Sequence, residues 1–209
     1  MVIIAVDPSF SRSGLCLLDS EDGVIATTSI SVPKVHKEGT IFQFYNSFPA
    51  AVWHARAIKE WVEEYAVRLD AVFMEYSALS SQSGPYLLPL QCMMYTEFES
   101  VLSASSYDAP EEAHSVPFYL IPPTAINSIV RPKKAKKRPK KGEIPEEPSH
   151  KISKEEGKRM IVDWVDAQYG LHLNHDEASA VILAYIGYMI LRGEYKNTYQ
   201  LCNRWYLEW

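Results

Sequence analysis

Acidic residues stand at three places where the sequence suggests that a strand ends or a helix begins. Asp7 and Glu75 each close a short apolar run that is typical of a buried strand. Asp176 and Glu177 stand directly before the apolar stretch 178–191, which is typical of a core helix. Taken one at a time, these acids have ordinary structural explanations: a turn, an exposed strand end and the dipole of a helix N-terminus.

Taken together, the acids predict a metal site. Strand ends in α/β sheets meet at one edge, where loops open a crevice for ligands. Clustered carboxylates repel one another unless they share protons or bind cations. Oxygen ligands without cysteine or a cage of histidines favour Mg²⁺, with Mn²⁺ as a substitute, over zinc. Two such ions about 3.5–4 Å apart can clamp the attacking and leaving oxygens of a phosphodiester displacement.

The elements that must position these acids alternate between strands and helices. Strands are expected at residues 2–6, 15–19, 24–32, 70–76 and 116–121. Helices are expected after a cap near Asn46 or Ser47, at 87–103, after a cap near Ser153, and at 174–193, with a short helix or turn at 122–130. This order predicts an α/β fold: a mixed sheet, with its first three strands antiparallel, flanked by helices.

Composition bounds the class of protein. A chain of 209 residues with 47% hydrophobic residues favours one globular domain over a disordered chain. We expect no leader sequence, because Met1 opens directly into a strand, and no membrane span, because the apolar run is too short. Cys16, Cys92 and Cys202 form no CxxC pair, which favours reduced thiols in a cytosol-like compartment.

Charge is strongly segregated along the chain. The net charge is −5, yet eight of the 21 lysines and arginines fall within residues 131–141. They are Arg131, Lys133, Lys134, Lys136, Lys137, Arg138, Lys140 and Lys141. The segment 131–150 also holds four prolines and almost nothing apolar, so we expect a flexible basic insertion. DNA phosphates are its expected partner, and a solvated loop or a localisation tract is the alternative.

Four blocks of this sequence, in order, resemble the RuvC-type Holliday-junction resolvases. They are "IIAVDPSFSRSGLCLLD", "AVFMEYSAL", "YLIPPTAINSIV" followed by "KISKEEGKRMIVDWV", and "NHDEASAVILAY". The resemblance spans residues 2–192. It implies a ribonuclease H-like fold, a homodimer and a divalent-metal-dependent endonuclease that acts on branched DNA. The domain would cover residues 1–192, with the insertion at 131–150 and an aromatic tail at 193–209.

The resemblance also implies roles for single residues. Asp7, Glu75 and Asp176 would be the ligands of two Mg²⁺ ions, and Glu177 joins them as a catalytic candidate. Lys154 matches the lysine that opens the third helix, close to a phosphate.

The last helix departs from the pattern of the family, which commonly has two acids three residues apart on one helical face. With Asp176 as the first acid, Ser179 stands where the second is expected. With Glu177 as the second acid, Asn174 takes the first place. His175 is a further candidate ligand or general base. The sequence leaves these alternatives open.

Aromatic residues near the expected site have two interpretations. Tyr76 and Tyr86 would stack on unpaired bases at a branch point, or they are ordinary core or interface residues. The apolar helix at 87–103 has more large residues than one buried face needs, which favours burial in a homodimer.

The sequence therefore predicts a structure-selective endonuclease that resolves four-way or other branched DNA by hydrolysis. We expect it in the cytoplasm of a bacterial cell or a phage-infected host, with an organellar or viral source left open. No membrane and no small-molecule cofactor are expected. The first alternative is a non-catalytic protein that binds branched DNA on a decayed nuclease fold. An actin-like ATPase is a third possibility, disfavoured because the sequence has no glycine-rich phosphate loop.

Overall fold

The structure is a computed structural model that describes residues 1–9, 12–31, 43–65, 67–76, 92, 95–96, 116–131 and 152–195. For residues 43–51 it describes the backbone alone. Most of the expected helix at 87–103, of the basic insertion and of the C-terminal tail lies outside the described residues, so these three expectations stay predictions.

A five-stranded mixed sheet forms the centre of the fold. Its strands are β1 (Val2–Asp7), β2 (Arg12–Asp19), β3 (Gly23–Ser31), β4 (Ala71–Glu75) and β5 (Phe118–Ile121). They are arranged in the order β3-β2-β1-β4-β5. The first three strands are antiparallel, whereas β4 runs parallel to both β1 and β5. The predicted mixed sheet with an antiparallel first half is confirmed.

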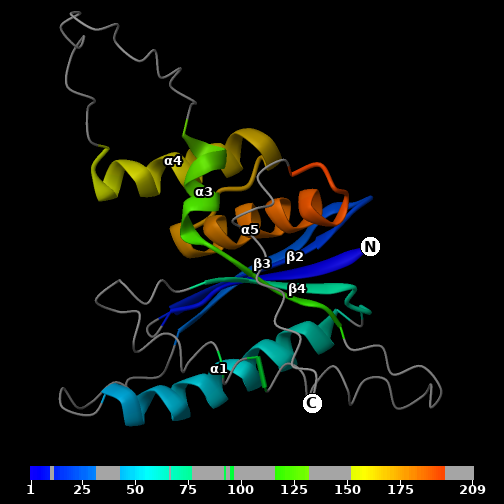
Figure 1. Cartoon of the computed structure of the whole chain (residues 1–209), viewed down its shortest axis with the longest axis vertical. Helices are drawn as coiled ribbons and strands as arrows, with labels where there is room; N and C mark the ends of the chain where they lie inside the picture. Colours follow the sequence, from blue (N-terminus) through cyan, green and yellow to red (C-terminus); the bar gives the residue numbers. More distant parts are fainter. Residues whose placement is uncertain are drawn as a thin grey trace, which may run out of the picture.

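Helices cover both faces of this sheet (Figure 1). They are α1 (Gln43–Glu64), α3 (Pro123–Val130), α4 (Lys154–Tyr169) and α5 (His175–Leu191). Figure 1 shows α1 along one face and α5 against the other, with α3 and α4 packed over α5. The first turns of α4 and α5 lie on the side of the view where β1 and β4 end.

One expected helix start is wrong. The backbone is already helical at Gln43, so Asn46 and Ser47 lie inside α1 and cannot cap it. A helix start is set mainly by the packing of the whole helix, and a single capping residue is a weak signal beside it. The cap near Ser153 is confirmed: its hydroxyl accepts from the Glu156 N–H, and the Glu156 carboxylate accepts from the Ser153 N–H in return.

The core lies on both sides of the sheet and is fullest under α5. Ile3 and Ala5 of β1 pack toward α5, and their neighbours Ile4 and Val6 pack on the opposite face. Such alternation is what a central strand between two helical layers requires. Helix α5 is buried on nearly every side, from Ala178 onward, because α3, α4 and the sheet surround it.

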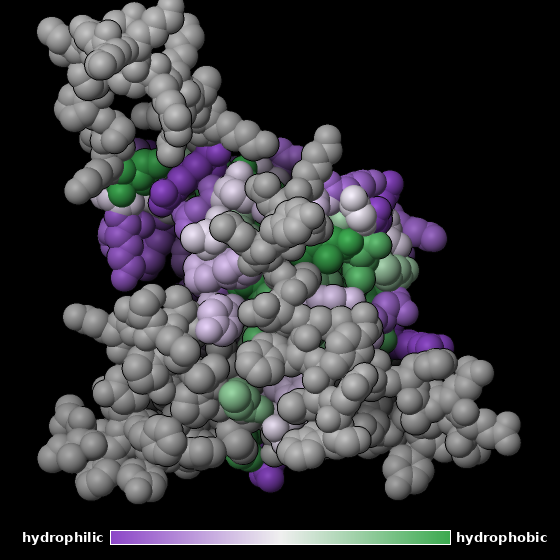
Figure 2. All heavy atoms as spheres, in the orientation of Figure 1, coloured by the Kyte–Doolittle hydropathy of each residue, from purple (hydrophilic) through white to green (hydrophobic). Residues whose placement is uncertain are grey.

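Charged and polar side chains cover the outer face of α4. Figure 2 shows hydrophilic spheres in the region where α4 lies in Figure 1. Lys154, Lys158 and Arg159 on this helix are exposed.

Within the described part of the chain, no helix is both long and apolar enough to cross a membrane.

Two helical glycines differ in what surrounds them, and this difference gives a test of the packing. A Cβ on Gly187 of α5 would lie 2.5 Å from Cδ2 of Phe73, inside the core. We expect Gly187→Ala to lower the free energy of unfolding by about 1–3 kcal/mol, because the ring and the helix must move apart. Chemical denaturation measured by circular dichroism checks this value.

The matched control is the same substitution in α4. A Cβ on Gly157 would meet only the Arg131 guanidinium, at 3.8 Å, so Gly157→Ala introduces no clash. It should raise stability by roughly 0.5–1 kcal/mol, because glycine in a helix interior is unfavourable relative to alanine. Equal effects of both substitutions would contradict the close packing of α5 on β4.

Candidate active site

Asp7 and Glu75 stand at the ends of neighbouring parallel strands. Val6 pairs with Met74 in the β1–β4 register, so the next residue of each strand reaches the same edge of the sheet. The two carboxyl groups hydrogen-bond to each other. Expected from sequence as two corners of one site, they do come together in the structure.

Loss of solvation and the charge of a neighbouring carboxylate raise the pKa of both carboxyl groups far above the ordinary range. For Asp7 the larger cause is loss of solvation, followed by the negative charge of Asp176. For Glu75 it is again loss of solvation, followed by the charge of Asp7. The hydrogen bond between the two groups couples their titration, so the pair holds a proton together at a pH where ordinary carboxyl groups are ionised.

A single row of residues across three strands forms the floor of the site. Asp7 of β1 is opposite Gly14 of β2, and Gly14 is opposite Ser29 of β3. The first turn of α5 lies across this row. A Cβ on Gly14 would be 1.9 Å from the backbone oxygen of Asp176, so only glycine allows the helix to approach this closely.

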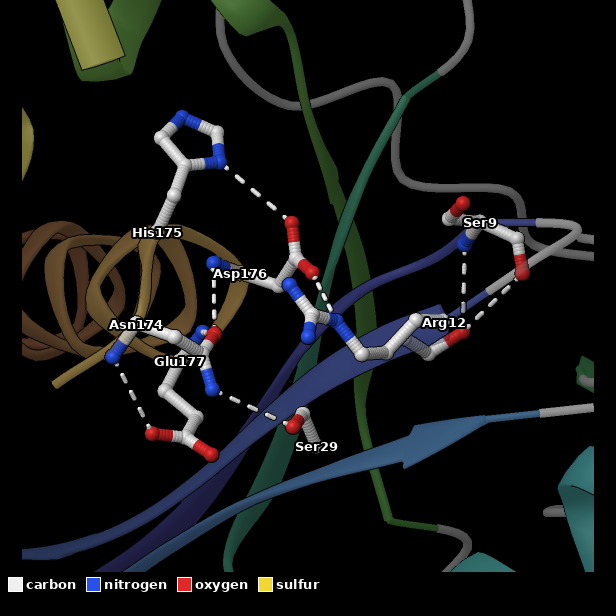
Figure 3. A network of polar contacts seen from close by, with 8 residues as sticks. Ser9, Arg12, Ser29, Asn174, His175, Asp176 and Glu177 are labelled. Carbon is white, nitrogen blue, oxygen red and sulfur yellow. Dashed lines mark hydrogen bonds and ion pairs between the residues drawn. The ribbon is translucent and has the colours of Figure 1, made fainter.

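Asn174 fixes the start of α5 on this row (Figure 3). Its side-chain oxygen accepts from the backbone N–H groups of Asp176 (3.0 Å) and Glu177 (3.1 Å). Its side-chain nitrogen donates to Oγ of Ser29 at 3.2 Å. The Glu177 carboxylate accepts from the Asn174 N–H at 3.4 Å, which completes a capping box. Glu177, a catalytic candidate from the sequence, therefore lies at the helix cap in this structure.

Ser179 and Asp176 face Asp7 from the same side of α5. The Ser179 side chain is 2% exposed, and its hydrogen bond to the Asp7 carboxylate lowers the pKa of Asp7. Asp176 acts on the same carboxylate through its charge. Of the alternatives that the sequence left open, the geometry matches the one in which Asp176 and Ser179 form the pair three residues apart.

The carboxylate of Asp176 also contacts an arginine and a histidine. Nε of Arg12 donates to one carboxylate oxygen at 2.5 Å, and Nδ1 of His175 lies 3.3 Å from the other (Figure 3). Arg12 is not among the site residues expected from the sequence. The available signal was its spacing from Gly14, because residues two apart on a strand share a face.

Two carboxyl groups of the site offer oxygen donors that fit a divalent cation. Within the described residues, no three His, Cys, Asp or Glu side chains are placed to surround a metal ion together. Asp7 and Glu75 do fit one ion, because both offer oxygen donors and share a proton that a cation would replace. Asp176, expected as a third ligand, has both oxygens engaged by Arg12 and His175.

The expected DNA-binding residues are only partly described. Lys154 is exposed at the first position of α4, and Arg131 is exposed at the end of α3, close to Gly157. Tyr76 is half-buried directly after β4, and its N–H donates to the Ile121 carbonyl at 2.7 Å. Lys133, Lys134, Lys136, Lys137 and Arg138 lie outside the described residues.

Comparison with known proteins finds likeness in structure but not in sequence. No protein-family profile matches the chain, and no curated protein matches it in sequence. A solved structure of Thermus thermophilus RuvC superposes with a TM-score of 0.52 at 14% identity, covering 97% of this chain and 99% of RuvC. T. thermophilus RuvC in complex with a Holliday-junction substrate gives 0.50 at 15% identity, covering 93% and 97%.

A Fowlpox virus resolvase in complex with Holliday-junction DNA gives a TM-score of 0.40 at 11% identity, covering 91% of this chain and 99% of the resolvase. The two RuvC structures match over nearly the whole length of both chains, so the similarity includes the mixed sheet and the helices on both of its faces. The chain has the RuvC-like, ribonuclease H-type fold.

Proposed function

We propose that this protein is a divalent-metal-dependent endonuclease that cuts four-way junctions or other branched DNA. The observation that carries the proposal is the half-buried, hydrogen-bonded Asp7–Glu75 pair at adjacent strand ends of a RuvC-like sheet. Two partly desolvated carboxyl groups placed side by side disfavour the ionised state, and binding of a cation would offset that cost.

Asp7 and Glu75 would hold Mg²⁺, or Mn²⁺ in its place. Such an ion, when bound, supplies Lewis-acid activation of water and of the phosphodiester. The protein residues orient the carboxylates and shape the site. Ser179 fixes the orientation of the Asp7 carboxylate through its hydrogen bond, and the contact of α5 with Gly14 closes one wall of the site against solvent.

Branched DNA is the substrate that the fold comparison favours, since one RuvC structure contains a Holliday-junction substrate. The exposed cations Arg131 and Lys154 would contact its phosphates, and the basic insertion would extend that contact. A homodimer would present one site to each of two opposing strands. We place this reaction in the cytoplasm of a bacterial cell or a phage-infected host.

A non-catalytic junction-binding protein is the second candidate. It is favoured by one specific observation: Asp176 is paired with Arg12, and the position three residues later is the neutral Ser179. Tight binding of junctions without metal-dependent nicking would distinguish it from an endonuclease.

Cleavage of a synthetic four-way junction tests the proposed reaction. We expect the wild type to nick the junction only with Mg²⁺ or Mn²⁺, and Asp7→Asn and Glu75→Gln to lower the rate by about 10²-fold or more, since each removes a metal-binding oxygen. Labelled strands resolved on a denaturing gel give the rates.

The matched controls are Asp22→Asn and Glu60→Gln, which change exposed carboxylates in the β2–β3 turn and on α1. Both should cleave like the wild type. An Asp7→Asn variant that cleaves as fast as the wild type would exclude the proposed site, and binding without any nicking would favour the second candidate.

The raised pKa values also predict a metal-linked effect on stability. Because the pKa values of Asp7 and Glu75 are raised by folding, the folded state favours their protonated forms. Without metal, stability should fall as pH rises from the ordinary carboxyl pKa through the raised values. At neutral pH, metal-free Asp7→Asn should therefore melt about 2–4 °C above the wild type.

Added Mg²⁺ should reverse this order. At a hundredfold excess over its dissociation constant it stabilises the wild type by about 2.7 kcal/mol, whereas Asp7→Asn should gain much less. Thermal unfolding with and without Mg²⁺ measures both effects, and Asp22→Asn should follow the wild type. A wild type that is insensitive to Mg²⁺ would contradict the assignment of the carboxylate pair as a cation site.

A further inference from the structure

Arg12 is held beside the carboxylate pair by the register of the sheet. Gly14 is opposite Asp7, and its α-carbon faces the first turn of α5. Arg12 stands two residues before Gly14 on the same strand, so it projects toward the same face. Figure 3 shows its guanidinium beside the Asp176 carboxylate. The arginine therefore reaches the site from β2 while Asp176 reaches it from α5.

The ion pair leaves part of the guanidinium available. Its bond to Asp176 uses Nε, and within the described residues neither terminal nitrogen of Arg12 has a recorded partner. The Arg12 side chain is 43% exposed, so these nitrogens can meet a ligand from solvent. A guanidinium presents paired N–H donors whose planar geometry matches the oxygens of a phosphate.

The side chains around Asp7 favour one metal ion and one guanidinium. Three carboxylates act there: Asp7, Glu75 and Asp176. The position that would add a fourth acid is Ser179, whose hydroxyl is committed to Asp7. A second divalent ion bound by Asp176 would have to displace Arg12 from that carboxylate.

We propose that Arg12, oriented by Asp176, binds the scissile phosphate and takes the place of a second metal ion. This inference rests on the proposed nuclease function and narrows it to one metal ion per chain. The guanidinium donates to non-bridging phosphate oxygens, where negative charge grows during displacement. Asp176 is then a positioning residue for Arg12, and Asp7 and Glu75 hold the ion.

Counting bound Mn²⁺ on the full chain tests the stoichiometry without any need for activity. We expect one ion per chain in the wild type, measured by titration calorimetry and by the electron spin resonance of free Mn²⁺. Arg12→Ala should bind the same single ion. Two ions on the wild type, or a second ion gained by Arg12→Ala, would overturn the proposal, since Arg12 would then only occupy a metal position.

Junction cleavage at saturating Mg²⁺ tests the role of the guanidinium. Arg12→Ala should lower kcat by about 10²–10³-fold with a much smaller change in KM. Arg12→Lys should recover part of the rate, and free guanidinium should rescue Arg12→Ala but not Asp7→Asn. The control is Arg68→Ala, an exposed arginine before β4, at the opposite end of that strand from Glu75, which should cleave like the wild type.

The outcomes separate this proposal from the function on which it rests. Cleavage by the wild type and equally by Arg12→Ala, with Mn²⁺ bound, rejects only the role of Arg12. Absence of both Mn²⁺ binding and cleavage in the wild type rejects the nuclease function and the role of Arg12 together. Thermal unfolding of Arg12→Ala in parallel shows whether a lost rate reflects a lost fold.

Discussion

The contact between Gly14 and the backbone of Asp176 is the constraint on which the site depends. A strand and a helix come so near at this point that no side chain fits between them. Because α5 begins there, its first turns can place Asp176 and Ser179 against Asp7, on the neighbouring strand. A larger residue at position 14 would push α5 away from β2 and so move Asp176 and Ser179 away from Asp7.

The electrostatic cost of that approach is concentrated on two half-buried carboxyl groups. Asp7 and Glu75 lose solvation and repel each other, and the protein meets this with a shared proton and a hydroxyl donor from Ser179. Such an arrangement is poor for stability alone, because replacing buried charges with neutral groups is often neutral or favourable. Its position at strand ends, where a ligand can enter, is the reason for proposing a cation-dependent reaction.

Sequence patterns predicted most of the fold, but less of the chemistry around α5. The apolar runs predicted the strands, and the residues that close two of these runs were Asp7 and Glu75. This was possible because the pattern of a strand is a local property of the sequence. Spacing could not show whether Ser179 or Glu177 faces Asp7, since both lie in the first two turns of α5. The structure distinguishes them because the Glu177 side chain turns back to the helix cap. Arg12 could not be predicted as a site residue because its partner, Asp176, is 164 residues away in the sequence.

Helix α5 is apolar around nearly its whole circumference, and this has a consequence for how the sequence can diverge. An amphipathic helix can roll on its neighbours, but a helix enclosed by a sheet and two other helices has no free side toward which to turn. One residue inserted or deleted between Asn174 and Ser179 would rotate everything beyond it by about 100°. The stretch should therefore tolerate substitution but not changes of length, and insertions in relatives should fall outside it.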